Sequence, residues 1–260
     1  MRSGDASRGA AAQFAFEMSL FSRDRLSVFW ALLFPVLLIV ILGFAFGGSA
    51  PASATGQRGN TYVESLVAGV IGMNLMGMAL FNIGTSLLQY RERGVFARLL
   101  VGGTPLGGAF AGLVLNRYVV VAIQLFLMIA TAHAVLGLHL SVTNPAFALA
   151  LASGIACFTL LGLTFALLVR TSTAAMALGN ALYLPLAFLS GAYFNVDRLP
   201  GSALLHILPS SAEIDMLRLS IHGTLASLVT APSFIGVILW TITFGVIAFF
   251  LRGRLLTEGR

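Results

Sequence analysis

Residues 89–105, QYRERGVFARLLVGGTP, place four charges within eight positions of a chain of 260 residues in which only 9% are charged. The charges are Arg91, Glu92, Arg93 and Arg98, and a long apolar run lies on each side of them. A short charged element between two such runs is typical of a connection between membrane-spanning helices. This stretch therefore predicts a membrane protein before the rest of the chain is considered.

The overall composition agrees with a membrane protein. The chain is 58% hydrophobic with a mean hydropathy of +0.95, whereas a soluble domain carries about 25% charged residues. Six apolar segments are each long enough to cross a bilayer at about 1.5 Å per residue, namely 27–47, 65–88, 113–138, 146–169, 173–194 and 232–252. We therefore expect an all-α integral membrane protein with six transmembrane helices in a single transmembrane domain, residues 1–260.

The distribution of arginine predicts the orientation of the chain. All fifteen basic residues are Arg, and twelve of them flank the segments on one side of the membrane, whereas only Arg58, Arg198 and Arg218 lie on the other. Because basic residues are enriched in cytoplasmic loops, both termini and the 89–112 loop are predicted to be cytoplasmic. The net charge of +6 then reflects contact with membrane lipids, and no nucleic acid is expected as a partner. The predicted location is the cytoplasmic membrane of a bacterium.

Several kinds of chemistry are excluded by composition. Without any Lys the chain cannot form an ordinary P-loop, so it cannot bind ATP in that way. Its one cysteine, Cys157, lies in an apolar run, and its four histidines lack metal-binding spacing. We expect no cofactor and no metal on this chain, and no enzymatic activity of its own. The alternative, a membrane-embedded enzyme, would need an outward cluster of four residues: Glu213, Asp215, His206 and His222.

The opening stretch has the pattern of a short amphipathic helix over 91–101. At 100° per residue, one arc of about 140° collects its apolar residues: Val95, Phe96, Leu99 and Leu100. Gly102-Gly103 is a helix stop and Thr104-Pro105 begins a new element. A cytoplasmic loop that only sets orientation would explain the Arg residues but not the apolar arc. We therefore predict a helix that docks on the membrane surface or in a groove of another protein.

Two further segments are amphipathic or only partly apolar. Phe14, Met18 and Phe21 follow helical spacing, which predicts an interfacial helix over 10–25 along the inner membrane surface. The 195–231 segment has apolar patches too short to span, separated by turn-forming residues. This pattern predicts short helices over 198–222 that enter the outer leaflet or cap the bundle.

Four amides within the predicted spans are candidates for a substrate pathway: Asn74, Asn82, Gln124 and Asn180. Polar groups at this depth either bond another helix or line a pathway, and the sequence leaves both possibilities open. No predicted span has Asp or Glu near its centre, whereas ion-coupled carriers usually need such a group. A secondary carrier therefore remains only as an alternative.

The order of these features resembles the membrane (permease) subunit of type-2 ABC exporters, in its drug- and antibiotic-resistance-like branch. The resemblance rests on QYRERGVFARLLVGGTPLG at 89–107, LPLAFLSGAYFNVDRLPG at 184–201 and LPSSAEIDMLRLSIHG at 208–223, and covers nearly the whole chain. It implies that the 91–101 helix is a coupling helix seated on a separate ATPase subunit. The implied contact residues are Arg91, Glu92, Gly94, Phe96, Arg98, Thr104 and Pro105. The implied outer cap is carried by Leu199, Pro200, Gly201 and Pro209.

The resemblance also implies an assembly and a function. Two permease copies, identical or paralogous, would join two ATPase subunits that hold ATP and Mg²⁺ and do the hydrolysis. An apolar pathway with a few amides is suited to an amphiphilic drug, antibiotic or lipid moving outward, and export of a polysaccharide or glycolipid is the alternative within the family. Members of the family often carry charges after Thr-Pro, whereas residues 106–110 here are neutral.

Overall fold

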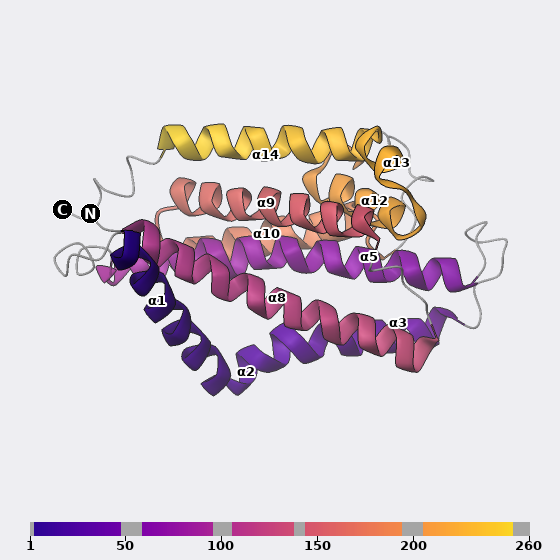
Figure 1. The fold of residues 1–260 in the computed structure, drawn as a ribbon, viewed down its shortest axis with the longest axis horizontal. Helices are drawn as coiled ribbons and strands as arrows, with labels where there is room; N and C mark the ends of the chain where they lie inside the picture. The colour runs from indigo at the N-terminus through magenta and orange to yellow at the C-terminus, as the bar shows by residue number, and fades with distance from the viewer. Residues whose placement is uncertain (1–2, 48–58, 96–105, 138–143, 194–204, 252–260) are drawn as a thin grey trace.

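The computed structural model describes residues 3–47, 59–95, 106–137, 144–193 and 205–251, and no β-strand occurs within them (Figure 1). This confirms the all-helical prediction for the described residues. The elements are α1 (Ser3–Arg23), α2 (Arg25–Val28), the π-helix η1 (Phe29–Leu33), α3 (Phe34–Gly47), α5 (Gly59–Gly77), the π-helix η2 (Met78–Gly84), α6 (Thr85–Glu92), α8 (Leu106–Leu136), α9 (Pro145–Leu168), α10 (Ser172–Leu189), α12 (Pro209–His222), α13 (Leu225–Val229) and α14 (Pro232–Leu251).

Five helical segments are long and apolar enough to cross a membrane: Val63–Glu92, Val114–Leu136, Pro145–Leu168, Ser172–Leu189 and Pro232–Leu251. They correspond to five of the six predicted spans. The first predicted span, 27–47, is occupied by α2, η1 and α3, and its apolar part, Phe29–Ala45, is shorter than the other five. The described residues therefore contain five candidate spans and one shorter apolar helix.

The long helices run alternately up and down, so their ends gather at two ends of the bundle (Figure 1). We call the end where α6 ends and α10 begins the Arg-rich end, because Arg91 lies in the last turn of α6, Arg93 directly follows that helix and Arg170 precedes α10. Helices α12 and α13 lie at the opposite end, which we call the capped end. The two ends therefore differ in both charge and architecture.

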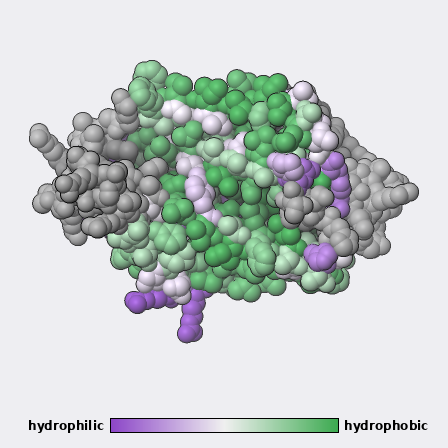
Figure 2. Space-filling view, viewed as in Figure 1, coloured by the Kyte–Doolittle hydropathy of each residue, from purple (hydrophilic) through white to green (hydrophobic). Residues whose placement is uncertain are grey.

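The continuous helix formed by α5, η2 and α6 is the centre of the bundle. Its side chains Leu75, Met76 and Ile83 are fully buried, and it packs against α3, α9 and α12. By contrast, α10 and α14 expose many large apolar side chains, and Figure 2 shows a nearly continuous hydrophobic surface between the two ends. Such a surface would make the protein poorly soluble in water, but it suits the hydrocarbon core of a membrane.

The π-helix η2 lies in the middle of this central helix. The Thr85 hydroxyl, directly after η2, donates a hydrogen bond to the Leu80 carbonyl at 3.1 Å. Close beside it α9 approaches at Gly162, where a Cβ atom would lie only 2.6 Å from the Ala79 carbonyl oxygen. The small residue therefore permits the close packing of α9 on η2.

Several predicted boundaries differ from the structure. Helix α1 begins at Ser3, earlier than the predicted 10–25, and α8 begins at Leu106, directly after the helix-starting Thr104-Pro105 pair. Helix α13 was not predicted, although Thr224 and Ser227 form a capping box at its start. Of the predicted re-entrant segment 198–222, the structure describes only residues 205–222, which contain α12.

The predicted helix over 91–101 differs at its start. Arg91 and Glu92 form the last residues of α6, a turn follows at Arg93, and Gly94 has a positive φ of 64°. A left-handed residue ends a helix, and glycine adopts this conformation without steric cost. Val95 is again helical, and residues 96–105 lie outside the described residues. Any helix after this turn therefore begins near Val95 rather than at Arg91.

Candidate functional site

The Arg-rich end is organised by two side chains of the opening stretch. The Arg91 guanidinium donates hydrogen bonds to the carbonyl oxygens of Val169 (3.2 Å) and Arg170 (2.5 Å). The Glu92 carboxylate accepts hydrogen bonds from the backbone N–H and the hydroxyl of Ser172, both at 2.6 Å. We call these five residues the α6–α10 clamp.

The clamp follows from the chemistry of two helix ends. Val169 and Arg170 lie in the connection between α9, which ends at Leu168, and α10, where their carbonyls have no helical partner, and one guanidinium satisfies both of them. N–H groups at the N-terminal end of α10 are equally unpaired, and a carboxylate both accepts from them and is favoured by the helix dipole. The Thr171 hydroxyl caps the same end by accepting from the Ala174 N–H at 3.2 Å. The end of α6 is thus tied to both α9 and α10.

Sequence reasoning assigned Arg91 and Glu92 to a contact with another subunit, and the structure shows them bonded within the chain. Their contact with an ATPase stays a prediction, as it does for Gly94 at the turn. The other predicted contact residues, Phe96, Arg98, Thr104 and Pro105, lie outside the described residues. The clamp itself was missed, because its partners follow α6 by about eighty positions and only the Thr171-Ser172 capping pattern marks them.

A second set of polar contacts joins α1 to the bundle beside α6. The Glu17 carboxylate and the Arg117 guanidinium of α8 are 3.2 Å apart, with side chains only 5% and 14% exposed. Arg117 also donates to the Ser86 hydroxyl at 3.2 Å, and Gln13 bridges Glu17 (3.2 Å) and the Tyr90 hydroxyl (3.4 Å). Burial raises the pKa of Glu17 above its ordinary value, an effect that Arg117 and Gln13 partly offset. We call these five residues the α1–α8 network.

The network shows how α1 is oriented. Its polar Glu17 faces the protein, while Phe16 and Leu20 are 54% and 51% exposed. An apolar exposed face of this kind is consistent with an interfacial helix, as the sequence predicted. The buried polar face was not predicted, because helical spacing alone cannot show that Glu17 meets Arg117 one hundred positions later.

The four predicted pathway amides divide into two pairs. Asn74 is partly buried and donates to the Val70 carbonyl at 2.8 Å, and Gln124 is 5% exposed. Asn82 on η2 and Asn180 on α10 are exposed, and Asn180 donates to the Met176 carbonyl at 2.9 Å. The structure therefore places two amides in the interior and two on the outer surface of the described chain.

The exposed amides lie on elements that contact each other. Helix α10 packs on η2 through the edge-to-face pair of Phe81 and Tyr183, with ring centroids 5.6 Å apart. Gly179 lies against the same Phe81 ring, where a Cβ atom would be only 2.9 Å away. Asn82 directly follows Phe81, and Asn180 directly follows Gly179, so both exposed amides lie next to this contact.

At the capped end, α12 is packed deep in the protein. Pro209, one of the four residues predicted for the outer cap, is the first residue of α12, and its role in a cap stays a prediction. The other three, Leu199, Pro200 and Gly201, lie outside the described residues. The other end of α12 is held by Asn144, whose amide donates to the carbonyls of Ser220 (3.1 Å) and Gly223 (2.7 Å). Ten residues of α12 are buried, which is what a helix capping a bundle requires.

Glu213 on α12 is fully buried against α9. Among the described residues its carboxyl oxygens have no hydrogen-bond partner, and they occupy the space where a Cβ atom on Gly154 would lie, 2.1 Å from the nearer oxygen. Burial raises the pKa of Glu213 well above its usual range, because desolvation disfavours the charged form. A neutral carboxyl is far less costly to bury than a carboxylate.

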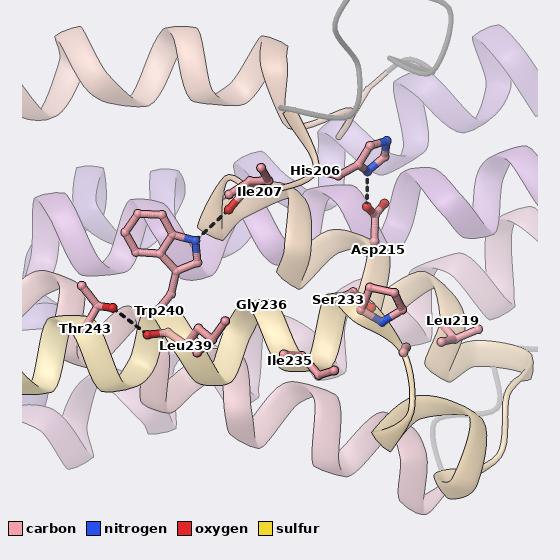
Figure 3. A pocket seen from close by; sticks show the side chains of 12 residues that line it. His206, Ile207, Asp215, Leu219, Ser233, Ile235, Gly236, Leu239, Trp240 and Thr243 are labelled. Atoms are coloured by element: carbon pink, nitrogen blue, oxygen red, sulfur yellow. Dashed lines mark hydrogen bonds and ion pairs between the residues drawn. The ribbon is translucent and has the colours of Figure 1, made fainter.

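The residues of the alternative enzymatic site do not converge. His206 pairs with Asp215 at 2.7 Å (Figure 3), and His222 pairs instead with Glu64 at 2.8 Å. Glu213 is buried against Gly154. Within the described part of the chain, no group of three or more His, Cys, Asp or Glu residues could hold a metal ion. The described residues thus offer isolated pairs instead of a catalytic constellation.

Comparison with known protein families gives the class to which this architecture belongs. Residues 11–222 match the family described as "ABC-2 type transporter". The match covers well over half of the chain, so the chain belongs to this family of membrane transporter subunits of ABC exporters. No curated protein sequence matches the chain.

Proposed function

We propose that this subunit exports an amphiphilic compound across the bacterial cytoplasmic membrane, driven by ATP that a separate ATPase subunit binds with Mg²⁺ and hydrolyses. In this proposal the chain crosses the membrane six times, with the shorter helix of α2, η1 and α3 as the first span. Both termini and the Arg-rich end are cytoplasmic, which follows from the excess of Arg there. The coupling contact is the segment from Val95 to Pro105, which includes Phe96 and Arg98.

The α6–α10 clamp is the observation that carries the coupling mechanism. The proposed contact follows α6 directly, so a displacement of it acts first on Arg91 and Glu92. Because these side chains hold the two carbonyls that directly follow α9 and the N–H and hydroxyl of Ser172, the first residue of α10, the displacement is passed to both helices. The bond between Gln13 and Tyr90 passes it to α1 as well. One push at the membrane surface can therefore tilt several spans together.

The exposed amides support a second permease copy. A polar side chain facing hydrocarbon is costly, so such residues usually face protein or a water-filled cavity. Asn82 and Asn180 are exposed on neighbouring elements in the apolar segments. We place the second copy, identical or paralogous, against this surface, with the pathway between the two copies. The interior amides Asn74 and Gln124 then have a smaller part in it.

The proposed substrate class follows from the same surface. The described parts of the candidate spans are apolar, with few charges, so a pathway along them suits a largely hydrophobic molecule with a few hydrogen-bonding groups. An amphiphilic drug, antibiotic or lipid has this chemistry, whereas a polysaccharide would need many polar partners.

Export in proteoliposomes, reconstituted with the ATPase subunit that co-purifies with this chain, tests the proposal. Arg98→Glu should abolish ATP-dependent export of a fluorescent amphiphile while leaving membrane insertion unchanged. Arg25→Glu is the matched control, because Arg25 is an exposed arginine of α2, apart from the proposed contact. Full export by Arg98→Glu would contradict the coupling role, and export driven by an ion gradient without ATP would show a secondary carrier.

A further inference from the structure

A groove of about 840 Å³ lies between α12 and α14 at the capped end, away from the residues discussed as coupling or pathway sites (Figure 3). Its walls are apolar and include Leu219 of α12 and Ile235, Leu239 and Trp240 of α14. His206 and Asp215 form its polar end, where they are hydrogen-bonded to each other at 2.7 Å. The volume lies in the range that binds a ligand of drug or lipid size.

The polar groups deeper in the groove are already satisfied within the chain. The Trp240 indole N–H donates to the Ile207 carbonyl at 2.7 Å, and the Thr243 hydroxyl donates to the Leu239 carbonyl at 2.8 Å (Figure 3). The Trp240 and Thr243 donors therefore need no further partner from a ligand. A polar ligand would gain little there, whereas a hydrocarbon chain would fill the space without leaving polar groups unpaired.

The groove has the depth of one membrane leaflet. Its α14 lining runs from Pro232, the first residue of that helix, to Thr243. Eleven residues at 1.5 Å each give about 16 Å, close to half of the roughly 30 Å hydrocarbon core. The polar pair therefore lies at the level of the headgroups if α14 begins at the membrane surface.

The surface of α14 around the groove faces lipid. Ile235 and Leu239 are 53% and 58% exposed, and four large apolar side chains are exposed further along this helix: Ile242, Val246, Phe249 and Phe250. Thr243 is exposed among them, and its hydroxyl donates to the Leu239 carbonyl of the same helix. No exposed amide interrupts them, in contrast to Asn180 on α10. The molecules with direct access to this groove are the lipids of the bilayer.

We propose that this groove binds one acyl chain of a phospholipid, whose headgroup lies beside His206 and Asp215. The apolar length holds the chain, and the mouth supplies an imidazole and a carboxylate for a zwitterionic headgroup that carries both a phosphate and an ammonium group. The bound lipid would fill the contact between α12 and α14 and so stabilise the cap. That the bound phospholipid belongs to the outer leaflet follows from the proposed orientation. The binding of its acyl chain does not depend on export or on an ATPase.

Photo-labelling tests this proposal on the full chain in nanodiscs, with phosphatidylethanolamine that carries a diazirine in the middle of one acyl chain. Mass spectrometry of digested protein should find the label concentrated on peptides of α12 and the first half of α14. Leu239→Trp should reduce this labelling about fivefold, because an indole ring takes up the width of a chain. Ile242→Trp is the matched control: Ile242 is 57% exposed on the same helix but does not line the groove.

Leu219→Trp, which narrows the groove from α12, should give the same loss and keeps the test valid if Leu239→Trp fails to fold. Labelling spread evenly along the exposed face of α14, or unchanged in both groove variants, would overturn the proposal. Because the labelling is done without ATP and without an ATPase subunit, the result is independent of whether the chain exports an amphiphile.

Discussion

Replacing Glu17 by Leu would separate the electrostatic part of the α1–α8 network from its packing. The change leaves the Arg117 guanidinium, 14% exposed, with the Ser86 hydroxyl at 3.2 Å as its remaining partner in the network. Removing one partner of a buried ion pair costs about 3–5 kcal/mol, because the other charge is left uncompensated. We expect the lower end, about 3 kcal/mol, since Arg117 keeps Ser86, and this equals more than a hundredfold in the equilibrium for undocking α1.

The same reasoning predicts that a second substitution restores docking. In Glu17→Leu/Arg117→Met the isolated charge is gone and two apolar side chains of similar size take its place, which is often neutral or stabilising. The raised pKa of Glu17 supports this expectation, because it indicates that burial destabilises the carboxylate more than the nearby Arg117 stabilises it. Because the pKa of Glu17 is raised when α1 is docked, docking of α1 weakens as the pH rises from 4.5 through that raised pKa. Mild acid should therefore not release α1.

Hydrogen exchange of α1 amides in nanodiscs, measured by mass spectrometry, reports the undocking equilibrium directly. We expect faster exchange across 11–23 in Glu17→Leu and near-normal exchange in the double variant. Equal exchange in wild type and Glu17→Leu would show that the pair does not hold α1. Equally fast exchange in the single and double variants would show that the side chains act through packing alone.

Three further predictions concern other parts of the fold. Glu213→Gln should melt at a higher temperature than wild type at pH 8, with a gap that narrows toward pH 5, because a carboxyl with a raised folded-state pKa destabilises the fold by about 1.4 kcal/mol for each pH unit from 4.5 up to that pKa; a pH-independent gap would refute this. Gly162→Ala should lower the melting temperature, since its Cβ atom would lie 2.6 Å from a backbone oxygen, whereas Gly245→Ala, with 3.6 Å to a side chain, should not; equal melting of the two would contradict the close approach. Glu92→Ala should speed hydrogen exchange at the first turn of α10 by removing both acceptors for Ser172, an effect that Arg93→Ala, at the exposed neighbouring position, should not share.

Long-range apolar patterns predicted the fold well. The spans 146–169 and 232–252 agree with α9 and α14 to within a residue at each end, because a run of about twenty apolar residues permits few structures other than a membrane helix. Shorter features were less predictable. The helix over 91–101 was placed by its apolar arc, which cannot show that Arg91 and Glu92 continue α6 and that Gly94 turns the chain.

The partners of charged residues could not be predicted, because they depend on contacts between distant segments. Glu213 was assigned to an outward cluster from its position beside Asp215, yet successive residues on a helix point in different directions, and Glu213 faces Gly154. The groove between α12 and α14 likewise has no signature in either segment alone. The chemistry of these sites is therefore determined by packing that the sequence pattern does not encode locally.

The central claim, that a separate ATPase drives this subunit through the segment after Gly94, is tested most directly by crosslinking at Phe96. A photoreactive phenylalanine analogue at that position, in the full chain within its own membrane, should form one major crosslink to a protein that carries an ATPase P-loop. The same analogue at Phe29, which is 39% exposed on η1, should not. Crosslinks from Phe96 to lipid alone, in cells that still export the substrate, would contradict the account.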